Sequence, residues 1–232
     1  MTRLAANRDT HLTPAEIAAE ALRQFDAGGH EPSIRSLAST LKVAPSAIYH
    51  HYGSRSEIVR AAVALVWDQA SAEMLELVPE PFDTDPAEVL VASGIATRRA
   101  WLAHYRLAPY MAATPESNEF VTNALGLLAN VLERMGLEGD QAAVALHTFS
   151  SFMIGAVLFA AARSAANEQL EATNGKRGSR DRFIGRTSSV GTSGERTRNS
   201  IAEIMEISMT DPKRDEELFA EGLERLVASL RD

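Results

Sequence analysis

The chain has 232 residues, of which 45% are hydrophobic, 23% charged and 6% aromatic, a composition typical of globular proteins and unlike that of disordered or collagen-like chains. It contains no cysteine, which excludes disulfide-stapled folds, thiolate metal sites, iron–sulfur clusters and cysteine nucleophiles. The net charge of −8 argues against a protein that binds nucleic acid through its overall charge. However, residues 32–56 contain Arg35, Lys42 and Arg55 and no acidic residue, so one window of this acidic chain is locally basic.

Neither the start of the chain nor its longest apolar run indicates secretion or a membrane span. The first residues lack the apolar stretch of a signal peptide, so we expect a cytoplasmic protein. The longest apolar run, residues 149–162, has 14 residues with two serines among them, whereas about 20 apolar residues are needed to cross a bilayer. This run therefore predicts a buried helix and no contact with a membrane.

Helix-start signals recur along the chain and predict an all-α fold. Asp85-Pro86 and Asp211-Pro212, for example, each combine a capping oxygen with a proline that suits the first turn of a helix. Between such signals apolar residues recur three and four apart, and strand-like alternation is not found. The segment 174–200, rich in Gly, Ser, Thr and Arg, predicts a flexible, solvated insert. Helices are predicted at 13–27, 33–41, 45–51, 54–77, 86–105, 108–113, 115–135, 140–167, 199–209 and 212–230.

The two short helices predicted at 33–41 and 45–51 have helix-turn-helix spacing. Their apolar residues would pack against the helix at 13–27, which leaves small and hydrogen-bonding side chains of the second helix outside. In a helix-turn-helix, such side chains contact base edges in the major groove, and flanking arginines contact phosphates. By spacing alone, a small helical subdomain that only packs internally is an equal alternative. The predicted DNA-binding residues are Arg35, Pro45, Ser46, Ala47, Tyr49, His50, His51 and Arg55.

A resemblance to a known family separates these alternatives. Residues 21–63, ALRQFDAGGHEPSIRSLASTLKVAPSAIYHHYGSRSEIVRAAV, resemble the N-terminal DNA-binding domain of the tetracycline-repressor (TetR) family of bacterial regulators. Residues 97–115, 146–158 and 219–230 resemble the ligand-binding and dimerisation region of the tetracycline-repressor branch. The resemblance implies a homodimer whose two reading heads change their separation when a ligand binds. It places the residues proposed above on DNA-contacting family positions.

The resemblance also implies two domains. The first, residues 1–56, would be a three-helix bundle with the helix-turn-helix, and the second, residues 57–232, a larger helical ligand-binding and dimerisation domain. Lys42 replaces the glycine that the family often has in the turn, so we expect either a strained backbone there or a slightly different turn.

Aromatic and hydroxyl residues of the second domain suggest a cavity for a mostly apolar or aromatic effector. At the drug-contacting positions of tetracycline repressors, the resemblance places Ser71, Ser93, Thr97, Met111 and Gly126. No imidazole is among them, so recognition of a tetracycline–magnesium complex is not expected. The predicted ligand-binding residues are Trp67, Ser93, Thr97, Trp101, Tyr105, Met111, His147 and Phe152, although aromatic residues at helical spacing are more often ordinary core residues. His104 and His147 lack metal-ligand spacing, so we expect structural or hydrogen-bonding roles for them, no metal and no cofactor.

A stripe of apolar residues near the C-terminus follows the spacing of one helix face. It would close the core of a monomer or, together with the helix at 140–167, form the four-helix bundle of a dimer, which we favour. The predicted dimerisation residues are Phe219, Leu223, Leu226, Val227 and Leu230.

These patterns predict a ligand-responsive repressor that binds double-stranded DNA at a palindromic operator and is released by the effector. The alternative is a helical small-molecule-binding protein or enzyme that retains a helix-turn-helix head. The sequence contains no HExxH, GxGxxG, GxxxxGK[ST] or GxSxG motif, so no enzyme is predicted. A nonspecific DNA-coating protein fits poorly with the charge of −8.

Overall fold

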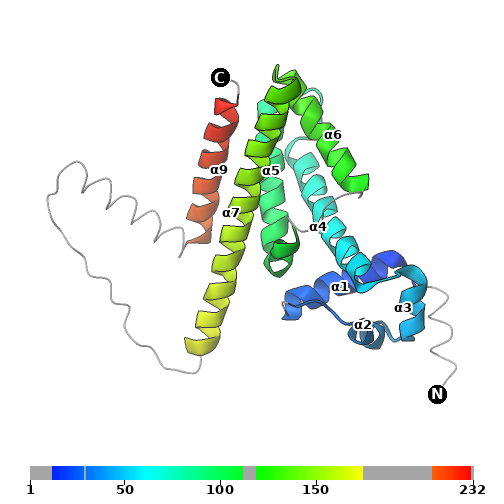
Figure 1. The fold of residues 1–232 in the computed structure, drawn as a ribbon. Helices are drawn as coiled ribbons and strands as arrows, with labels where there is room; N and C mark the ends of the chain where they lie inside the picture. The colour runs from blue at the N-terminus through cyan, green and yellow to red at the C-terminus, as the bar shows by residue number, and fades with distance from the viewer. Residues whose placement is uncertain (1–11, 29, 112–118, 175–210, 231–232) are drawn as a thin grey trace.

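The structure, a computed structural model, describes residues 12–28, 30–111, 119–174 and 211–230. Every regular element within these ranges is a helix, which confirms the all-α prediction. Helices α1 to α3 form a small head at one end, and α7 and α9 lie on the side of the molecule away from α2 and α3 (Figure 1). The elements are α1 (Pro14–Gly28), α2 (Ile34–Leu41), α3 (Pro45–His51), α4 (Arg55–Leu77), α5 (Pro86–Ala103), the 3₁₀ helix η1 (Tyr105–Tyr110), α6 (Glu119–Arg134), α7 (Gly139–Asn174) and α9 (Pro212–Ser229).

Side-chain caps fix the starts of several helices close to where the sequence predicts them. The Thr13 hydroxyl accepts a hydrogen bond from the Glu16 N–H at 3.2 Å, and the Glu16 carboxylate accepts one from the Thr13 N–H at 2.8 Å. This reciprocal pair is a capping box. The Asp85 carboxylate similarly accepts from the Ala87 N–H at 2.9 Å at the start of α5. Each cap satisfies a backbone donor that the first helical turn leaves without a partner.

Helix α4 joins the head to the remaining helices, and the hydrophobic packing is continuous along it. One buried cluster includes Phe25 of α1, Ile48 of α3, Val66 of α4, Trp101 of α5 and Val157 of α7. Hydrophobic contacts therefore cross the expected domain boundary between residues 56 and 57, so the head is packed on the core and not merely tethered to it.

Helix α9 approaches α5 closely at Gly94. A Cβ atom at this position would lie 2.5 Å from Cδ2 of Leu223 and 3.2 Å from the sulfur of Met153. Leu223 is completely buried, so its side chain has little space into which to retreat. Only glycine allows this approach of the two helices without displacement of a neighbour.

The C-terminal stripe packs largely against the core of its own chain, and its role in a dimer stays a prediction. Phe219, Leu223 and Val227 belong to the buried cluster that α9 forms with α5, α6 and α7, and Leu230 packs against that cluster. Leu226 is half-buried. The same spacing serves both roles in a sequence, and the half-buried Leu226 and Leu230 keep part of their surface accessible.

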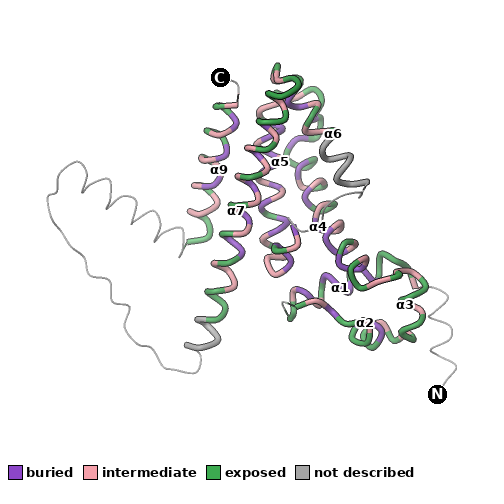
Figure 2. The backbone as a smooth tube through the Cα atoms, viewed as in Figure 1, coloured by how far each residue is buried: buried purple, intermediate pink, exposed green. Residues whose placement is uncertain are grey.

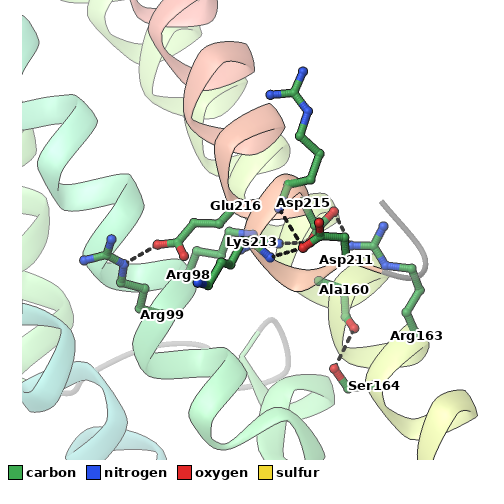
Figure 3. A network of polar contacts seen from close by, with 10 residues as sticks. Arg98, Arg99, Ala160, Arg163, Ser164, Asp211, Lys213, Asp215 and Glu216 are labelled. Atoms are coloured by element: carbon green, nitrogen blue, oxygen red, sulfur yellow. Dashed lines mark hydrogen bonds and ion pairs between the residues drawn. The ribbon is translucent and has the colours of Figure 1, made fainter. Parts of the chain in front are cut away.

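A cluster of ion pairs holds the first turn of α9 against α5 and α7 (Figure 3). The Asp215 carboxylate pairs with Arg98 of α5 and, at 2.6 Å, with Arg163 of α7. Glu216 pairs with Arg99 at 2.6 Å. Burial lowers the pKa of the Arg98 guanidinium, while the adjacent Asp215 carboxylate opposes that shift. Two arginines around one carboxylate thus tie three helices together.

Two predicted helices differ clearly in extent from those in the described part of the structure. The helix predicted at 108–113 is instead a 3₁₀ helix over Tyr105–Tyr110 with Pro109 inside it. Helix α7 continues to Asn174, beyond the predicted end at residue 167. Helix α6 is described from Glu119, whereas its predicted start at residue 115 and the helix predicted at 199–209 lie outside the described residues, as does almost all of the 174–200 insert.

Candidate nucleic-acid interface and ligand cavity

The turn between α2 and α3 has the expected strained residue. Lys42 adopts the left-handed conformation, with φ 58° and ψ 42°, which confirms the expectation from its replacement of glycine. Its N–H bonds to the Ala38 and Ser39 carbonyls, and the Val43 N–H bonds to the Ala38 carbonyl at 3.0 Å. These bonds close the end of α2 and offset the roughly 1–2 kcal/mol that a left-handed residue with a side chain costs.

Most residues of helix α3 are exposed or half-buried (Figure 2). Tyr49 is 55% exposed, whereas Ile48 is fully buried and holds the helix on the head. The Tyr52 hydroxyl donates a hydrogen bond to the Pro14 carbonyl at 3.0 Å, which ties the end of α3 to the start of α1. Among the other predicted DNA-binding residues of α3, Pro45, Ser46 and His50 are exposed, and Ala47 and His51 are half-buried.

Three cations surround the exposed side of the head. Arg35 in the first turn of α2 and Lys42 in the turn are both exposed, and neither forms an ion pair with another described residue. Arg55, the first residue of α4, is paired with Glu31. A phosphate at Arg55 would have to compete with this carboxylate, a feature that the acid-free window of residues 32–56 conceals because Glu31 lies just outside it.

A cavity of about 510 Å³ lies between α4, α5, α6 and α7, within the size range of small-molecule sites. Its apolar lining includes three aromatic residues, Trp67, Phe82 and Phe149, and three methionines, Met74, Met111 and Met153. Its polar lining consists of four hydroxyl residues, Ser71, Ser93, Thr97 and Ser150. The arrangement suits an apolar ligand with a few hydrogen-bonding groups.

The structure brings four of the eight predicted ligand-binding residues to this cavity, namely Trp67, Ser93, Thr97 and Met111. The other four lie elsewhere. Trp101 is fully buried behind Trp67, with ring centroids 5.4 Å apart in an edge-to-face contact. The Tyr105 hydroxyl donates to Glu168, and Phe152 stacks on Phe219 at 5.8 Å. His147 is exposed on α7. Of the residues that the resemblance placed at drug-contacting positions, Ser71 lines the cavity and Gly126 does not.

Residues after α4 form a part of the cavity that was not predicted from the sequence. Phe82 lines the cavity although it is 67% exposed, so it lies at the mouth. The backbone around it is fixed by Arg134 of α6, which donates to the Pro81 carbonyl at 2.8 Å and to the Thr84 carbonyl. Phe82 lies in an irregular segment, where hydrophobic periodicity gives no signal; the clustering of Pro and Asp around an isolated aromatic residue was the only available sign.

A polar cluster connects the head with the segment that borders the cavity. The two ring nitrogens of His104 lie 2.9 Å from Oδ2 of Asp26 in α1 and 2.9 Å from Oε1 of Gln69 in α4. This confirms the hydrogen-bonding role expected of His104. Arg106 of η1 donates to the Asp26 carbonyl and pairs with Glu168 of α7. The end of α1 is therefore held by side chains on either side of the start of η1.

The same segment reaches the cavity within a few residues. Tyr110 makes an edge-to-face contact with Phe25 of α1, with ring centroids 5.4 Å apart. The next residue, Met111, lines the cavity. One short segment thus touches both the head and the ligand cavity.

Helix α7 carries an exposed stripe on the side that it does not pack against the core. Its members recur three or four residues apart and are Val144, His147, Ser151, Gly155, Phe159 and Ala162. Val144 is 65% exposed and Phe159 is 59% exposed. By length and composition alone α7 is also able to span a membrane, with a mean hydropathy of 1.8 in a window that is only 22% buried, but a long apolar helix of a soluble protein meets the same criterion. Within the described residues, no three metal-ligating side chains gather into a site.

Comparisons with known proteins agree with this architecture. The sequence model of the family described as "Tetracyclin repressor-like, C-terminal domain" matches residues 78–232. ActR from Streptomyces coelicolor is 26% identical to this chain, and its solved structures without ligand and in complex with actinorhodin each give a TM-score of 0.65. Both matches cover 94% of this chain. They cover 94% of the ActR chain in the structure without ligand and 95% in the complex.

More distant structures share the fold. SCO7222, a TetR protein from the same organism, is 20% identical with a TM-score of 0.68, and the match covers 95% of this chain and 98% of that one. A TetR variant from Acinetobacter baumannii AYE in complex with minocycline is 20% identical with a TM-score of 0.63, and the match covers 94% of this chain and 92% of that one. A comparison with curated protein sequences gives no significant match. Because the family model covers two thirds of the chain and the head has the expected helix-turn-helix, this protein belongs to the tetracycline-repressor-like family of transcriptional regulators.

Proposed function

We propose that this regulator is a repressor that binds a palindromic operator as a homodimer and is released when a small, mostly apolar effector enters the cavity between α4, α5, α6 and α7. The observation that carries the proposal is the segment from His104 to Met111, which contacts the head at one end and lines the cavity at the other. ActR bound to actinorhodin and TetR bound to minocycline support a ligand-responsive role.

The exposed side of α3 is the proposed base-reading surface. Tyr49, His50 and Ser46 carry hydrogen-bonding groups that can reach base edges in the major groove. Pro45, Ala47 and His51 complete the contact surface, of which Ala47 supplies a small apolar side chain. Arg35, Lys42 and Arg55 surround this surface as cations for phosphates. Lys42 is an addition to the residues predicted from the sequence, and its exposure at the turn supports it.

Ligand response follows from the path between the cavity and α1. A ligand that displaces Met111 also moves η1, because the two are adjacent in the chain. Movement of η1 disturbs the contacts of Arg106 with Asp26 and of Tyr110 with Phe25, and these contacts orient the end of α1. A ligand that binds one arrangement better than the other shifts the population of heads that fit the operator.

The exposed stripe of α7 is the proposed dimer contact, and the part that the predicted α9 residues play in it stays a prediction. An apolar side chain such as Phe159, with 59% of its surface exposed, is stabilised when a second copy covers it. Gly155 has open space around the position of a Cβ atom, so a partner helix can approach closely there. Two-fold symmetry of the dimer also explains why the operator should be palindromic.

An enzyme that retains the head is the second candidate function. A regulator returns its effector unchanged, so incubation of any bound compound with the protein, followed by mass analysis, distinguishes the two. A cytoplasmic location accompanies the proposal because the operator is DNA.

The proposal is tested by titration of DNA from upstream of the gene, with scrambled DNA as control. The expected result is salt-dependent binding at least about a thousandfold tighter to one palindromic site than to scrambled DNA, and loss of that preference in the presence of a compound that raises the melting temperature. Equal affinity for both DNAs would refute the repressor. Specific binding that no stabilising compound changes would refute the ligand response.

A further inference from the structure

The described part of the cavity lining is uncharged. Its described lining residues number sixteen, and none of them is Lys, Arg, His, Asp or Glu. The neighbouring sequence 112–125 contains two ionisable residues, Glu116 and Glu119, and both are acidic. Neither the described lining nor this neighbouring sequence therefore supplies a cation to pair with an anionic ligand.

The four hydroxyls come from three different helices and differ in whether they already form a hydrogen bond within the protein. The Ser93 hydroxyl donates to the Val89 carbonyl at 2.7 Å, so its oxygen is left as an acceptor. The hydroxyls of Ser71, Thr97 and Ser150 form no hydrogen bond with any described residue. Ser93 and Thr97 are four residues apart and therefore lie on one face of α5. The lining can thus donate hydrogen bonds to neutral oxygens from α4, α5 and α7.

The apolar lining favours flat rings. Trp67 and Phe149 offer aromatic surfaces, and the three methionines are flexible side chains that adapt to an irregular or planar outline. At the mouth, Phe82 leaves two thirds of its surface exposed, and an aromatic ligand would cover it.

We infer that the effector is an uncharged aromatic compound with carbonyl or hydroxyl oxygens, and that the cavity rejects the corresponding anion. This inference rests on the proposed ligand response and specifies its ligand. A carboxylate in the cavity would lose its water and meet only hydroxyl dipoles, and an unpaired buried charge is strongly disfavoured. An amide of the same shape would lose far less and would accept hydrogen bonds from Ser71, Thr97 or Ser150.

The protein contains its own reporter for this binding. It has two tryptophans, of which Trp67 lines the cavity and Trp101 lies against Trp67. Titration of the full chain with anthraquinone-2-carboxamide and with anthraquinone-2-carboxylate, followed by tryptophan fluorescence, compares two probes of nearly equal shape that differ by one charge. We expect the carboxamide to bind at least about thirtyfold more tightly than the carboxylate.

A lysine placed in the cavity tests whether charge is the cause. Ser71→Lys introduces an ammonium group into the lining, and Ala72→Lys introduces the same group at the next residue, which is exposed and outside the cavity. We expect Ser71→Lys to reverse the preference in favour of the carboxylate and Ala72→Lys to leave it unchanged. Far-UV circular dichroism and melting temperature establish that both variants are folded.

The outcomes separate the inference from the proposed function. Equal or tighter binding of the carboxylate to the unmodified protein overturns the inference, and so does failure of both probes to bind. If operator binding is intact in the same preparation, the repressor survives either result and only the ligand class is wrong. If the carboxamide binds selectively but no DNA is recognised, the ligand class stands and the repressor fails. Should Ser71→Lys not fold, the pair of probes on the unmodified chain still decides.

Discussion

Replacement of Gly94 by alanine tests the packing of α9 on α5. The new Cβ would lie 2.5 Å from Leu223 and 3.2 Å from Met153, inside a fully buried contact. Overpacking of a core by one methyl group costs about 1–3 kcal/mol. Alanine in place of glycine inside a helix contributes about 1 kcal/mol in the opposite direction. The packing effect wins, so we expect Gly94→Ala to destabilise the protein by up to about 2 kcal/mol, or a few degrees in melting temperature.

A double-mutant cycle with Leu223→Ala tests whether the contact with Leu223 causes the loss of stability. Leu223→Ala alone should cost about 2–5 kcal/mol because it empties a buried site. In that background the Cβ of Gly94→Ala enters vacant space, and the substitution should become stabilising by about 1 kcal/mol. Gly126→Ala on α6 is the control, because no atom of the described residues lies within 4 Å of its added Cβ, and it should stabilise both backgrounds alike. Chemical denaturation monitored by circular dichroism gives the four free energies of unfolding. A stabilising Gly94→Ala in the unmodified protein would refute the argument.

Four further expectations concern function. Tyr49→Ala should weaken operator binding about tenfold while it leaves binding to scrambled DNA unchanged, because base contacts specify and phosphate contacts do not; Arg55→Ala should weaken both, and parallel losses in a filter-binding titration for the two variants would contradict this division. Phe82→Ala should reduce effector affinity several-fold without a change in melting temperature, since the side chain is mostly exposed, and calorimetry that shows unchanged affinity would remove Phe82 from the site. Arg106→Ala should leave DNA and effector affinities nearly intact but reduce the effect of one on the other; an undiminished response would exclude the proposed path. Phe159→Glu should dissociate the dimer in sedimentation equilibrium, and a dimer of unaltered strength would place the interface elsewhere.

The head could be predicted from the sequence because its signals are local. Capping residues, the spacing of apolar residues and the lysine in the turn each report on a few neighbouring residues, and the structure follows them at Thr13 and Lys42. The segment after α5 is different, since the 3₁₀ helix η1 lies where periodicity predicted an α-helix. Local patterns thus predicted which segments are helical more reliably than they predicted where each helix ends.

The cavity and the dimer contact depend on which face of a helix meets which neighbour, and periodicity does not carry this information. Trp67 and Trp101 are both aromatic residues at helical positions, yet one lines the cavity and the other is buried behind it. The stripe that contains Leu223 would look the same whether it packed against its own chain or against a second copy. Phe82 lies outside any periodic pattern, so its place in the cavity lining could be recognised only from the structure.

The ion pair between Arg55 and Glu31 has a consequence for how such a protein would search a chromosome. Before it meets DNA, one of the three cations around the reading surface is already neutralised by an internal carboxylate. Encounters with random sequence, which are held mainly by phosphate contacts, are then weaker and briefer. A correct operator, which engages the base-reading side chains as well, can supply the extra free energy needed to separate the pair. The Glu31 carboxylate would therefore reduce the residence time on random DNA more than it reduces the residence time on the operator.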